Sequence, residues 1–356
     1  MSRTPGRDVS TICKLRLKFG ALTVPRAGRN DSAKEDYNPC FLRMVRCSVI
    51  VVTHNSATAA EACLRALACQ DCEIIVVDNA SQDGTLALLR RLESELPLRL
   101  LAISRNLGFA GGVNHGAAAA SGQVLLLLNP DAVAEPAAID ALLACLKSSG
   151  ADAAGGALLD ANGQPDQGFC FRRLPTPASL AFEALLINQA WPRNPVNRRY
   201  RCLDADYSQP QIVDQPAGAC LAVLRTAWDA LHGMDEGFFP VWFEDVDFCA
   251  RLLGRHATIV YCPQARFRHS GAHSVGRMAF RDKQRFWYGN MLRYAQSHFS
   301  AISVLCLRAA ILGGMGLRIL ACLVGAKPAG VPFAEALRGY AGVAALTLGS
   351  YRRSPG

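Results

Sequence analysis

A regular alternation of short apolar runs with longer helix-patterned segments, between residues 45 and 131, limits the possible folds more than any other feature of this sequence. Its four apolar runs predict buried strands at 49–53, 73–78, 98–103 and 124–128. The segments between the runs predict helices, and the pattern Thr58-x-x-Glu61 predicts a capping box that opens the first one. Strands and helices in alternation predict an α/β fold with a mostly parallel sheet flanked by helices.

Polar residues stand at the end of each predicted strand. Because ligands bind at the carboxyl ends of parallel strands, these residues predict a polar pocket large enough for a nucleotide. They are Thr53-His54-Asn55, Asp78-Asn79, Ser104-Arg105-Asn106 and Asn129-Pro130-Asp131. Neither a G-x-G-x-x-G nor a Walker A sequence occurs, which argues against a nicotinamide enzyme and a P-loop NTPase.

The net charge of +9 is concentrated at the two ends of the chain. Residues 1–43 hold nine Lys or Arg against four acids, residues 44–275 hold 18 against 23, and residues 276–356 hold 11 against two. A nucleic-acid enzyme is expected to carry its positive charge on the folded core. Basic ends on an acidic core predict instead a peripheral contact with an anionic membrane surface, and no nucleic-acid partner.

The same three segments predict the domain organisation. Residues 1–43 are polar and weakly patterned, which predicts a basic, disordered extension; Met44, directly before the first strand, offers an alternative start of translation. Residues 44–275 form the predicted α/β domain, and residues 276–356 form a basic, apolar helical tail. The 14 cysteines lack the dense spacing of a disulfide scaffold, which predicts reduced thiols in the cytoplasm.

Arg308 and Arg318 interrupt the apolar run 299–326 of that tail, which argues against a conventional membrane span. Ten residues apart, the two arginines fall within about 80° of each other on a helix. This spacing predicts a helix that lies in the membrane interface. A buried helical subdomain and an oligomer contact remain alternatives.

Five motifs follow one another in order across residues 45–275. They are Ser48-Val-Ile-Val-Val-Thr-His-Asn-Ser56, Val76-Val-Asp-Asn-Ala-Ser81, Asn106-Leu-Gly-Phe-Ala-Gly-Gly-Val-Asn114, Leu127-Leu-Asn-Pro-Asp131 and Phe239-Pro-Val-Trp-Phe-Glu-Asp-Val-Asp-Phe248, followed by His269-Ser270. Together they resemble the family 2 glycosyltransferases, particularly their rhamnosyltransferase-like branch. The resemblance implies the Rossmann-like GT-A fold, with the tail as a helical C-terminal appendage. It also implies an enzyme that moves a sugar from a nucleotide diphosphate donor to an acceptor hydroxyl with inversion.

Asp245 is the catalytic general base that the resemblance implies. The acceptor hydroxyl of an inverting displacement loses its proton as it attacks, and one carboxylate within hydrogen-bond reach accepts that proton. Neighbouring Glu244 and Trp242 are then expected to bind substrate, the tryptophan by stacking on the acceptor sugar. The alternatives are acids favoured by a helix N-terminus and an aromatic residue of the core.

Asp78 matches an aspartate that binds the pyrimidine base of the donor in the family, and a carboxylate suits the imide N–H of uracil and thymine. The alternative is an Asx turn to Ser81. The strand ends and the motifs contribute six further expected substrate-binding residues: Thr53, Asn55, Arg105, Asn106, Asn114 and Asn129.

Asp131 stands where the family has a metal-binding D-x-D motif, with Asn129 in place of the first acid. The resemblance implies a divalent ion there, Mg²⁺ or Mn²⁺, that bridges the two donor phosphates. His269 matches a third metal ligand of the family. A helix N-cap role for Asp131, a structural role for His269 and competition from His273 are the alternatives.

The reaction expected from this resemblance is transfer of L-rhamnose from dTDP-rhamnose to a glycan or lipid-linked acceptor. It would serve cell-surface polysaccharide synthesis at the cytoplasmic face of the plasma membrane. Gln284-Arg-Phe-Trp287 does not match the Q-x-x-R-W motif of processive synthases, which predicts single additions. A UDP-hexose donor and a catalytically silent nucleotide-sugar-binding protein, suggested by Asn129, are the alternatives.

Overall fold

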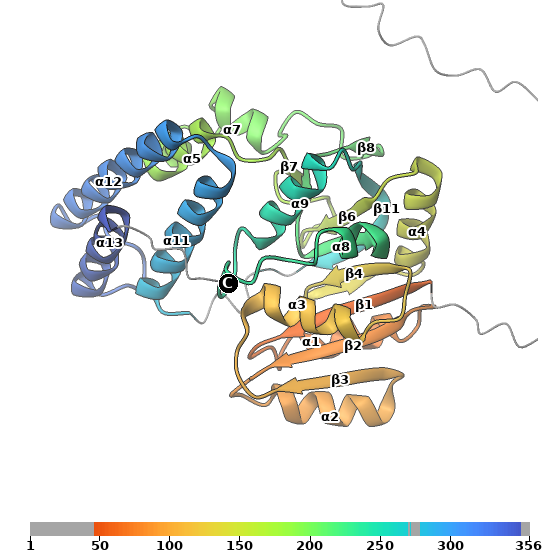
Figure 1. Cartoon of the computed structure of the whole chain (residues 1–356). Coiled ribbons are helices and arrows are strands. Elements are labelled where there is room, and N and C mark those ends of the chain that lie inside the picture. The colour runs from red at the N-terminus through yellow and green to blue at the C-terminus, as the bar shows by residue number, and fades with distance from the viewer. Residues whose placement is uncertain (1–45, 270, 272–277, 350–356) are drawn as a thin grey trace, which may run out of the picture. The chain divides into compact units, whose positions relative to one another are not determined.

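The computed structural model describes residues 46–269, 271 and 278–349. Its centre is a nine-stranded sheet in the order β3-β2-β1-β4-β10-β6-β11-β5, with β8 paired to β11 (Figure 1). Strands β1 to β4 pair in parallel, whereas β10 is antiparallel to both of its neighbours. The strands are β1 (Cys47–Thr53), β2 (Glu73–Asn79), β3 (Leu98–Ile103), β4 (Val124–Leu128), β5 (Ala132–Ala134), β6 (Ala153–Leu159), β8 (Gln211–Ile212), β10 (Cys220–Leu224) and β11 (Ile259–His269).

The mixed, mostly parallel sheet confirms the expected α/β fold. The four predicted strands correspond to β1 to β4, and the near-continuous burial of β1, β2 and β4 explains why apolar runs revealed them. The edge strand β3 is only partly buried. A separate two-stranded sheet pairs β7 (Phe171–Arg172) with β9 (Gln215–Pro216). The helices between and after the first strands are α1 (Ala60–Leu67), α2 (Thr85–Glu95), α3 (Gly108–Ala119) and α4 (Ala138–Ser149).

The predicted capping box at the start of α1 is wrong. The N-cap residue is Ala59, and no side chain caps this end of the helix. The backbone amides of Ala59 and Ala60 both donate to the carbonyl oxygen of Ser56, so a backbone turn replaces the cap. Glu61 pairs instead with Arg65 and Arg91, at 2.8 and 3.0 Å.

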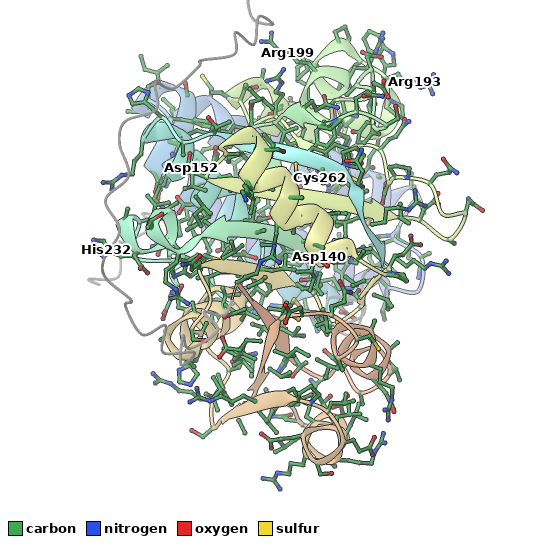
Figure 2. All side chains as sticks on the ribbon, turned by 90° about the vertical axis from the view of Figure 1, so that its right-hand side faces the viewer. Asp140, Asp152, Arg193, Arg199, His232 and Cys262 are labelled. Atoms are coloured by element: carbon green, nitrogen blue, oxygen red, sulfur yellow. The ribbon has the colours of Figure 1, made fainter. Side chains whose placement is uncertain are left out.

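The helices pack closely on the sheet, and this packing determines where the strand ends lie. A Cβ atom at Gly116 of α3 would lie 2.6 Å from Cγ2 of Ile50, so only glycine allows this helix to approach β1 so closely. On another part of the sheet, Figure 2 shows Cys262 of β11 against α4, the helix that carries Asp140. Its Sγ donates to the carbonyl oxygen of Ala141 over 3.6 Å.

A second hydrophobic core joins the C-terminal helices to the middle of the chain. It contains Leu180 of α5, Phe243 and Val246 at the start of α9, and Met291 of α11. Helices α11, α12 and α13 pack on one another, and α12 also packs on α5 (Figure 1). The helices after α4 are α5 (Pro177–Ala184), α6 (Ile187–Ala190), α7 (Pro195–Tyr200), α8 (Arg225–Ala230), α9 (Glu244–Gly254), α11 (Phe280–His298), α12 (Ala301–Leu323) and α13 (Phe333–Leu348).

The two arginines of α12 both turn toward the protein. Arg308 donates to the carbonyl oxygen of Thr347 over 3.1 Å, and Arg318 donates to that of Ala184 over 2.6 Å. The outward side of α12 is apolar and exposed, at Ile302, Leu305, Leu317, Leu320 and Leu323. Within the described ranges, α12 is the one helix that by length and composition is apolar enough to cross a membrane.

Candidate active site

Asp245 lies in the first turn of α9, with its carboxylate held by three donors. The backbone amide of Gly218 and Nε2 of Gln215 donate to Oδ2, over 2.9 and 3.1 Å. The amide of Val246 donates to Oδ1 over 2.9 Å. A Cβ atom at residue 218 would lie 2.9 Å from Cβ of Asp245, so glycine is required for this approach. These contacts fix the direction in which the carboxylate points.

The backbone that leads into Asp245 is strained. Trp242 and Phe243 have φ values of +80° and +71°, a left-handed conformation that bulky L residues rarely adopt. Phe243 is buried in the second core, against Trp287 and Tyr294, which offsets the strain. Strain of this kind collects at functional sites, where packing holds a residue in an otherwise unfavourable position.

Burial raises the pKa of both acids at this helix start. It raises the pKa of Asp245, although the amides of Gly218 and Val246 and the charge of Arg172 oppose part of the effect. Burial, and then the negative charge of Asp245, place the pKa of Glu244 well above its ordinary value. A raised pKa strengthens Asp245 as a proton acceptor in its ionised form.

His269 and Asp131 come together because β5 pairs with β11. The antiparallel register sets His269 opposite Ala132, the residue that follows Asp131. Nε2 of His269 lies 3.3 Å from Oδ1 of Asp131. The imidazole stacks on Phe169, with ring centroids 5.2 Å apart. Asp131 therefore precedes a strand, and the N-cap alternative for it is wrong.

One cavity of about 430 Å³ collects these groups. It is lined by five of the predicted site residues, Asn129, Trp242, Glu244, Asp245 and His269. Of the described residues, four have a buried side-chain nitrogen or oxygen without a hydrogen-bond partner, and three of the four line this cavity: Gln215 with Oε1, Glu244 with Oε2 and His269 with Nε2. Native proteins leave few such atoms unpaired, so their concentration indicates a place where a polar ligand binds.

The donor set at Asp131 and His269 fits a divalent ion that is held partly by substrate. A carboxylate oxygen and a buried imidazole nitrogen without a hydrogen bond face each other, and both are ligands for such an ion. Across the described part of the chain no three His, Cys, Asp or Glu side chains gather into a metal site. Two protein ligands therefore leave the remaining positions to phosphate oxygens and water. His273, the competing histidine, lies outside the described residues.

A second polar group forms at the ends of β1 and β2. Thr53 Oγ1 donates to Oδ1 of the buried Asp78 over 3.2 Å, and the amide of Ser81 donates to its Oδ2 over 3.3 Å. The latter bond is the Asx turn that was the alternative for Asp78. The side-chain oxygen of Asn55 accepts from the amide of Gln82 over 2.8 Å. The expected substrate role of these residues remains a prediction.

His54 organises the same group from its centre. Nδ1 lies 2.9 Å from the carbonyl oxygen of Asn79, which can only accept, so Nδ1 carries the proton. Nε2 is then the acceptor that Nδ2 of Asn106 approaches at 3.5 Å. His54, Asn79 and Asn106 line a cavity of about 330 Å³ that shares Phe109 and Val241 with the larger one.

Two predicted substrate residues lie apart from these partners. Arg105 is exposed at the end of β3. Asn114 of α3 binds the backbone around Met234, whose amide donates to Oδ1 and whose carbonyl accepts from Nδ2, both over 2.9 Å. It lines neither cavity. The structure thus shows Asn114 as a clamp between α3 and the loop after α8.

Several cavity residues were missed from the sequence. Arg172 of β7, Glu183 of α5 and Trp287 of α11 all line the cavity that contains Asp245. Arg172 is held by a 2.6 Å bond from its Nε to the carbonyl oxygen of Gly168. These residues come from segments without a recognisable motif. The pairing of β7 with β9 brings Arg172 to the cavity, and the second core brings α5 and α11 to it.

Comparison with known proteins shows the family of this chain. The model of glycosyl transferase family 2 matches residues 48–189. The chain is 31% identical over 245 residues to N-acetylglucosaminyl-diphospho-decaprenol L-rhamnosyltransferase of Mycobacterium tuberculosis, an alignment that covers 64% of this chain and 77% of the relative. The chain belongs to glycosyltransferase family 2.

The fold of this family 2 glycosyltransferase is also similar to solved structures. The crystal structure of GalNAc-T7 with UDP, GalNAc and Mn²⁺ superposes with a TM-score of 0.52 at 13% identity, over 85% of this chain and 55% of that one. At this identity the likeness concerns the fold alone. It agrees with the expected GT-A architecture.

Proposed function

We propose that this glycosyltransferase moves L-rhamnose from dTDP-rhamnose to a hydroxyl of a glycan or lipid-linked acceptor, with inversion, in the cavity that Asp245 lines. The observation that carries the proposal is the concentration of three unpaired buried polar atoms in residues that line this cavity. They belong to Gln215, Glu244 and His269, and a sugar or a diphosphate supplies the partners they lack.

Asp245 acts as the general base in this proposal. Its Oδ2 is oriented by Gly218 and Gln215, so the carboxylate is held ready for an incoming hydroxyl. The hydroxyl oxygen bonds to the anomeric carbon while its proton passes to Asp245 and the bond to the departing nucleoside diphosphate breaks. Since burial raises the pKa of Asp245, kcat/KM should fall as the pH is lowered through that value.

Asp131 and His269 would hold a divalent ion, Mg²⁺ or Mn²⁺, against the donor diphosphate. Such an ion neutralises negative charge on the leaving group when it is bound. Arg172 contributes a positive charge of the chain itself at the same cavity. Asn129 lines the cavity beside them and, as an amide, adds no further negative charge.

The donor side of the proposal rests on the strand-end group. Asp78 would bind the imide N–H of the base by exchanging its bond to the Ser81 amide, with Thr53, Asn55 and Asn106 around it. The rhamnosyl and lipid-linked assignments rest on the mycobacterial relative, whose name states both. We place the reaction at the cytoplasmic face of the membrane, with the exposed apolar side of α12 as the point of contact.

The test is calorimetric titration of the full chain with dTDP-rhamnose, UDP-glucose and UDP-galactose, each with and without Mn²⁺ or Mg²⁺, followed by a transfer assay with the preferred donor. Binding of dTDP-rhamnose that the metal strengthens, with turnover abolished in Asp245→Asn, supports the proposal. Preference for a UDP-hexose would overturn the rhamnosyl assignment and keep the reaction type. Donor binding without any turnover would instead identify a silent nucleotide-sugar-binding protein.

A further inference from the structure

We propose that a third cavity, beside the catalytic one, binds the diphosphate and the adjoining apolar chain of a lipid-linked acceptor. This inference rests on the proposed transfer at Asp245 and names the acceptor class that reaches it. The cavity has a volume of about 620 Å³ and lies among α5, α11, α12 and α13. It shares Glu183, Trp242 and Trp287 with the catalytic cavity, so the two spaces adjoin.

The shared wall suits a sugar ring. Trp242 and Trp287 meet edge to face, with ring centroids 5.6 Å apart, and both rings line both cavities. Indole faces pack on the apolar side of sugar rings, and carboxylates accept hydrogen bonds from sugar hydroxyls. Glu183 supplies such a carboxylate at this wall; its Oε2 already accepts from Nδ2 of Asn188 over 3.0 Å. A sugar held here would present its hydroxyl toward Asp245.

The third cavity carries more positive than negative charge. Lys283 and Arg318 line it, and Glu183 is the acid among its lining residues. Nη1 of Arg318 is anchored by the carbonyl oxygen of Ala184, and the guanidinium lies 5.9 Å from the ring centre of Tyr288. This anchor fixes the guanidinium and leaves its other N–H groups available to phosphate oxygens.

Gly314 makes the anchor possible. A Cβ atom at this position would lie 1.9 Å from the carbonyl oxygen of Ala184, the same atom that Arg318 binds. Only glycine therefore lets α12 approach α5 closely enough to hold Arg318 at the cavity. An arginine inside an apolar helix predicted a helix in the membrane interface. The structure places this arginine at a cavity that can hold an anion.

Part of the wall of this cavity is apolar and stands next in the chain to exposed apolar residues. Ala321, Ala326 and Pro328 line it at the C-terminal end of α12. Between them in the chain stand Leu323 and Val324, which are 62% and 83% exposed, and Leu320 is 61% exposed. Exposed apolar side chains in a row on one helix mark a contact with apolar material. A lipid chain leaving the cavity at this end would meet them.

The order of groups along the two cavities matches the order of groups in such an acceptor. The base for the hydroxyl lines the catalytic cavity, and the two indoles for the sugar line both cavities. The two cations for the diphosphate and the small and apolar residues for the chain line the adjoining cavity. This order is the charge and shape complementarity that assigns the cavity to a polyisoprenoid diphosphate. A second copy of the chain would explain the apolar side of α12 but not the two cations that line the cavity.

The test uses direct binding, which needs no turnover. Farnesyl diphosphate and farnesol are titrated into the full chain and into four single variants: Lys283→Ala, Ala321→Trp, Arg338→Ala and Asp131→Asn. We expect farnesyl diphosphate to bind and farnesol to bind at least about tenfold more weakly, since farnesol lacks the charged group. Lys283→Ala and Ala321→Trp should weaken farnesyl diphosphate by about tenfold, the first by removing charge and the second by filling the cavity.

Two variants serve as controls in this experiment. Arg338→Ala removes an exposed positive charge from α13 that does not line the cavity, and it should leave binding unchanged. Asp131→Asn tests whether the diphosphate enters the donor site instead. Failure of the wild type to bind, equal effects in all variants, or an effect confined to Asp131→Asn would overturn the inference. The donor titration of the preceding section tests the proposed function separately, because it needs no lipid.

Discussion

Two groups of polar residues at the strand ends differ in how their hydrogen bonds are satisfied. At the ends of β1 and β2, Thr53, Asp78 and His54 bind each other or the nearby backbone. Around the catalytic cavity, Gln215, Glu244 and His269 each keep one buried atom without a partner. The first group is complete without a ligand, and the second is not.

This difference indicates which group carries the chemistry. An unpaired buried polar atom destabilises a fold by roughly 1–3 kcal/mol, so three around one cavity are retained against stability. The strained backbone at Trp242 and Phe243 lies at the same place. A satisfied group suits a recognition site, which exchanges bonds when its ligand binds. The unsatisfied, strained group suits the site of reaction.

The largest expected effect is that of Asp245→Asn. Without the general base, kcat should fall by about 10²- to 10⁴-fold, because an amide cannot accept the proton. Initial rates of nucleoside diphosphate release measure this loss. Donor affinity should change little, since the base acts on the acceptor.

Asp247→Asn is the matched control for this variant. Asp247 is buried two residues further along α9, but it binds His298 and Arg251, over 2.8 and 2.7 Å, rather than the cavity. Its loss should lower Tm by roughly 5 °C or more while kcat below the transition stays near the wild-type value. Equal losses of kcat in both variants would show that α9 is needed for folding only.

The next largest effect is expected for His269→Ala. Removing one of two protein ligands should raise the Mn²⁺ concentration needed for half-maximal activity by at least about tenfold. The neighbouring Phe169 and the β5–β11 pairing should keep the fold intact. A metal titration of activity, with circular dichroism to check folding, makes the measurement. An unchanged metal requirement would assign His269 a structural role.

A smaller effect is expected at the satisfied group, for Asp78→Asn. An amide keeps the acceptor for Thr53 or Ser81 but loses the charge-assisted bond to the base, worth about 1.5–3 kcal/mol. KM for the donor should rise by about tenfold or more, with little change in kcat. If Tm falls and KM stays constant, Asp78 serves the Asx turn alone, and the strand-end group is not the recognition site.

The smallest effect is a gain of stability in Glu244→Gln. Because the folded-state pKa of Glu244 is raised, its contribution to stability is present below its unfolded-state pKa and is lost as the pH rises through the folded value. The glutamine variant should therefore melt roughly 2–4 °C higher than the wild type at pH 8. At pH 4 the two proteins should melt together. A gap independent of pH would mean that the pKa of Glu244 is the same in the folded and the unfolded protein.

The first half of the fold could be predicted because each of its strands is recognisable within a short stretch of sequence. β1, β2 and β4 are buried, largely apolar runs, and burial on both faces of a parallel sheet leaves that signature in sequence. The capping box failed since the carbonyl of Ser56, rather than a side chain, receives the first amides of α1. Backbone acceptors leave no mark in a residue pattern.

Only those residues of the candidate site that stand within recognisable motifs could be predicted from the sequence. Asp245, Glu244 and His269 lie in segments with recognisable patterns, and all three line one cavity. Glu183 and Trp287 stand more than 100 residues apart and meet only through the second core. The role of Asn114 as a clamp depends on a loop 120 residues later in the chain, which no local pattern reveals.

The most direct test of the difference between the two groups is a crystal structure of the Asp245→Asn protein with dTDP-rhamnose, Mn²⁺ and an acceptor sugar. We expect the diphosphate to lie beside Asp131 and His269, and a sugar to supply partners to Oε1 of Gln215 and Oε2 of Glu244. We also expect the base of the nucleotide to replace the Ser81 amide at Asp78. A donor bound elsewhere, with Gln215, Glu244 and His269 still unpaired, would contradict the account.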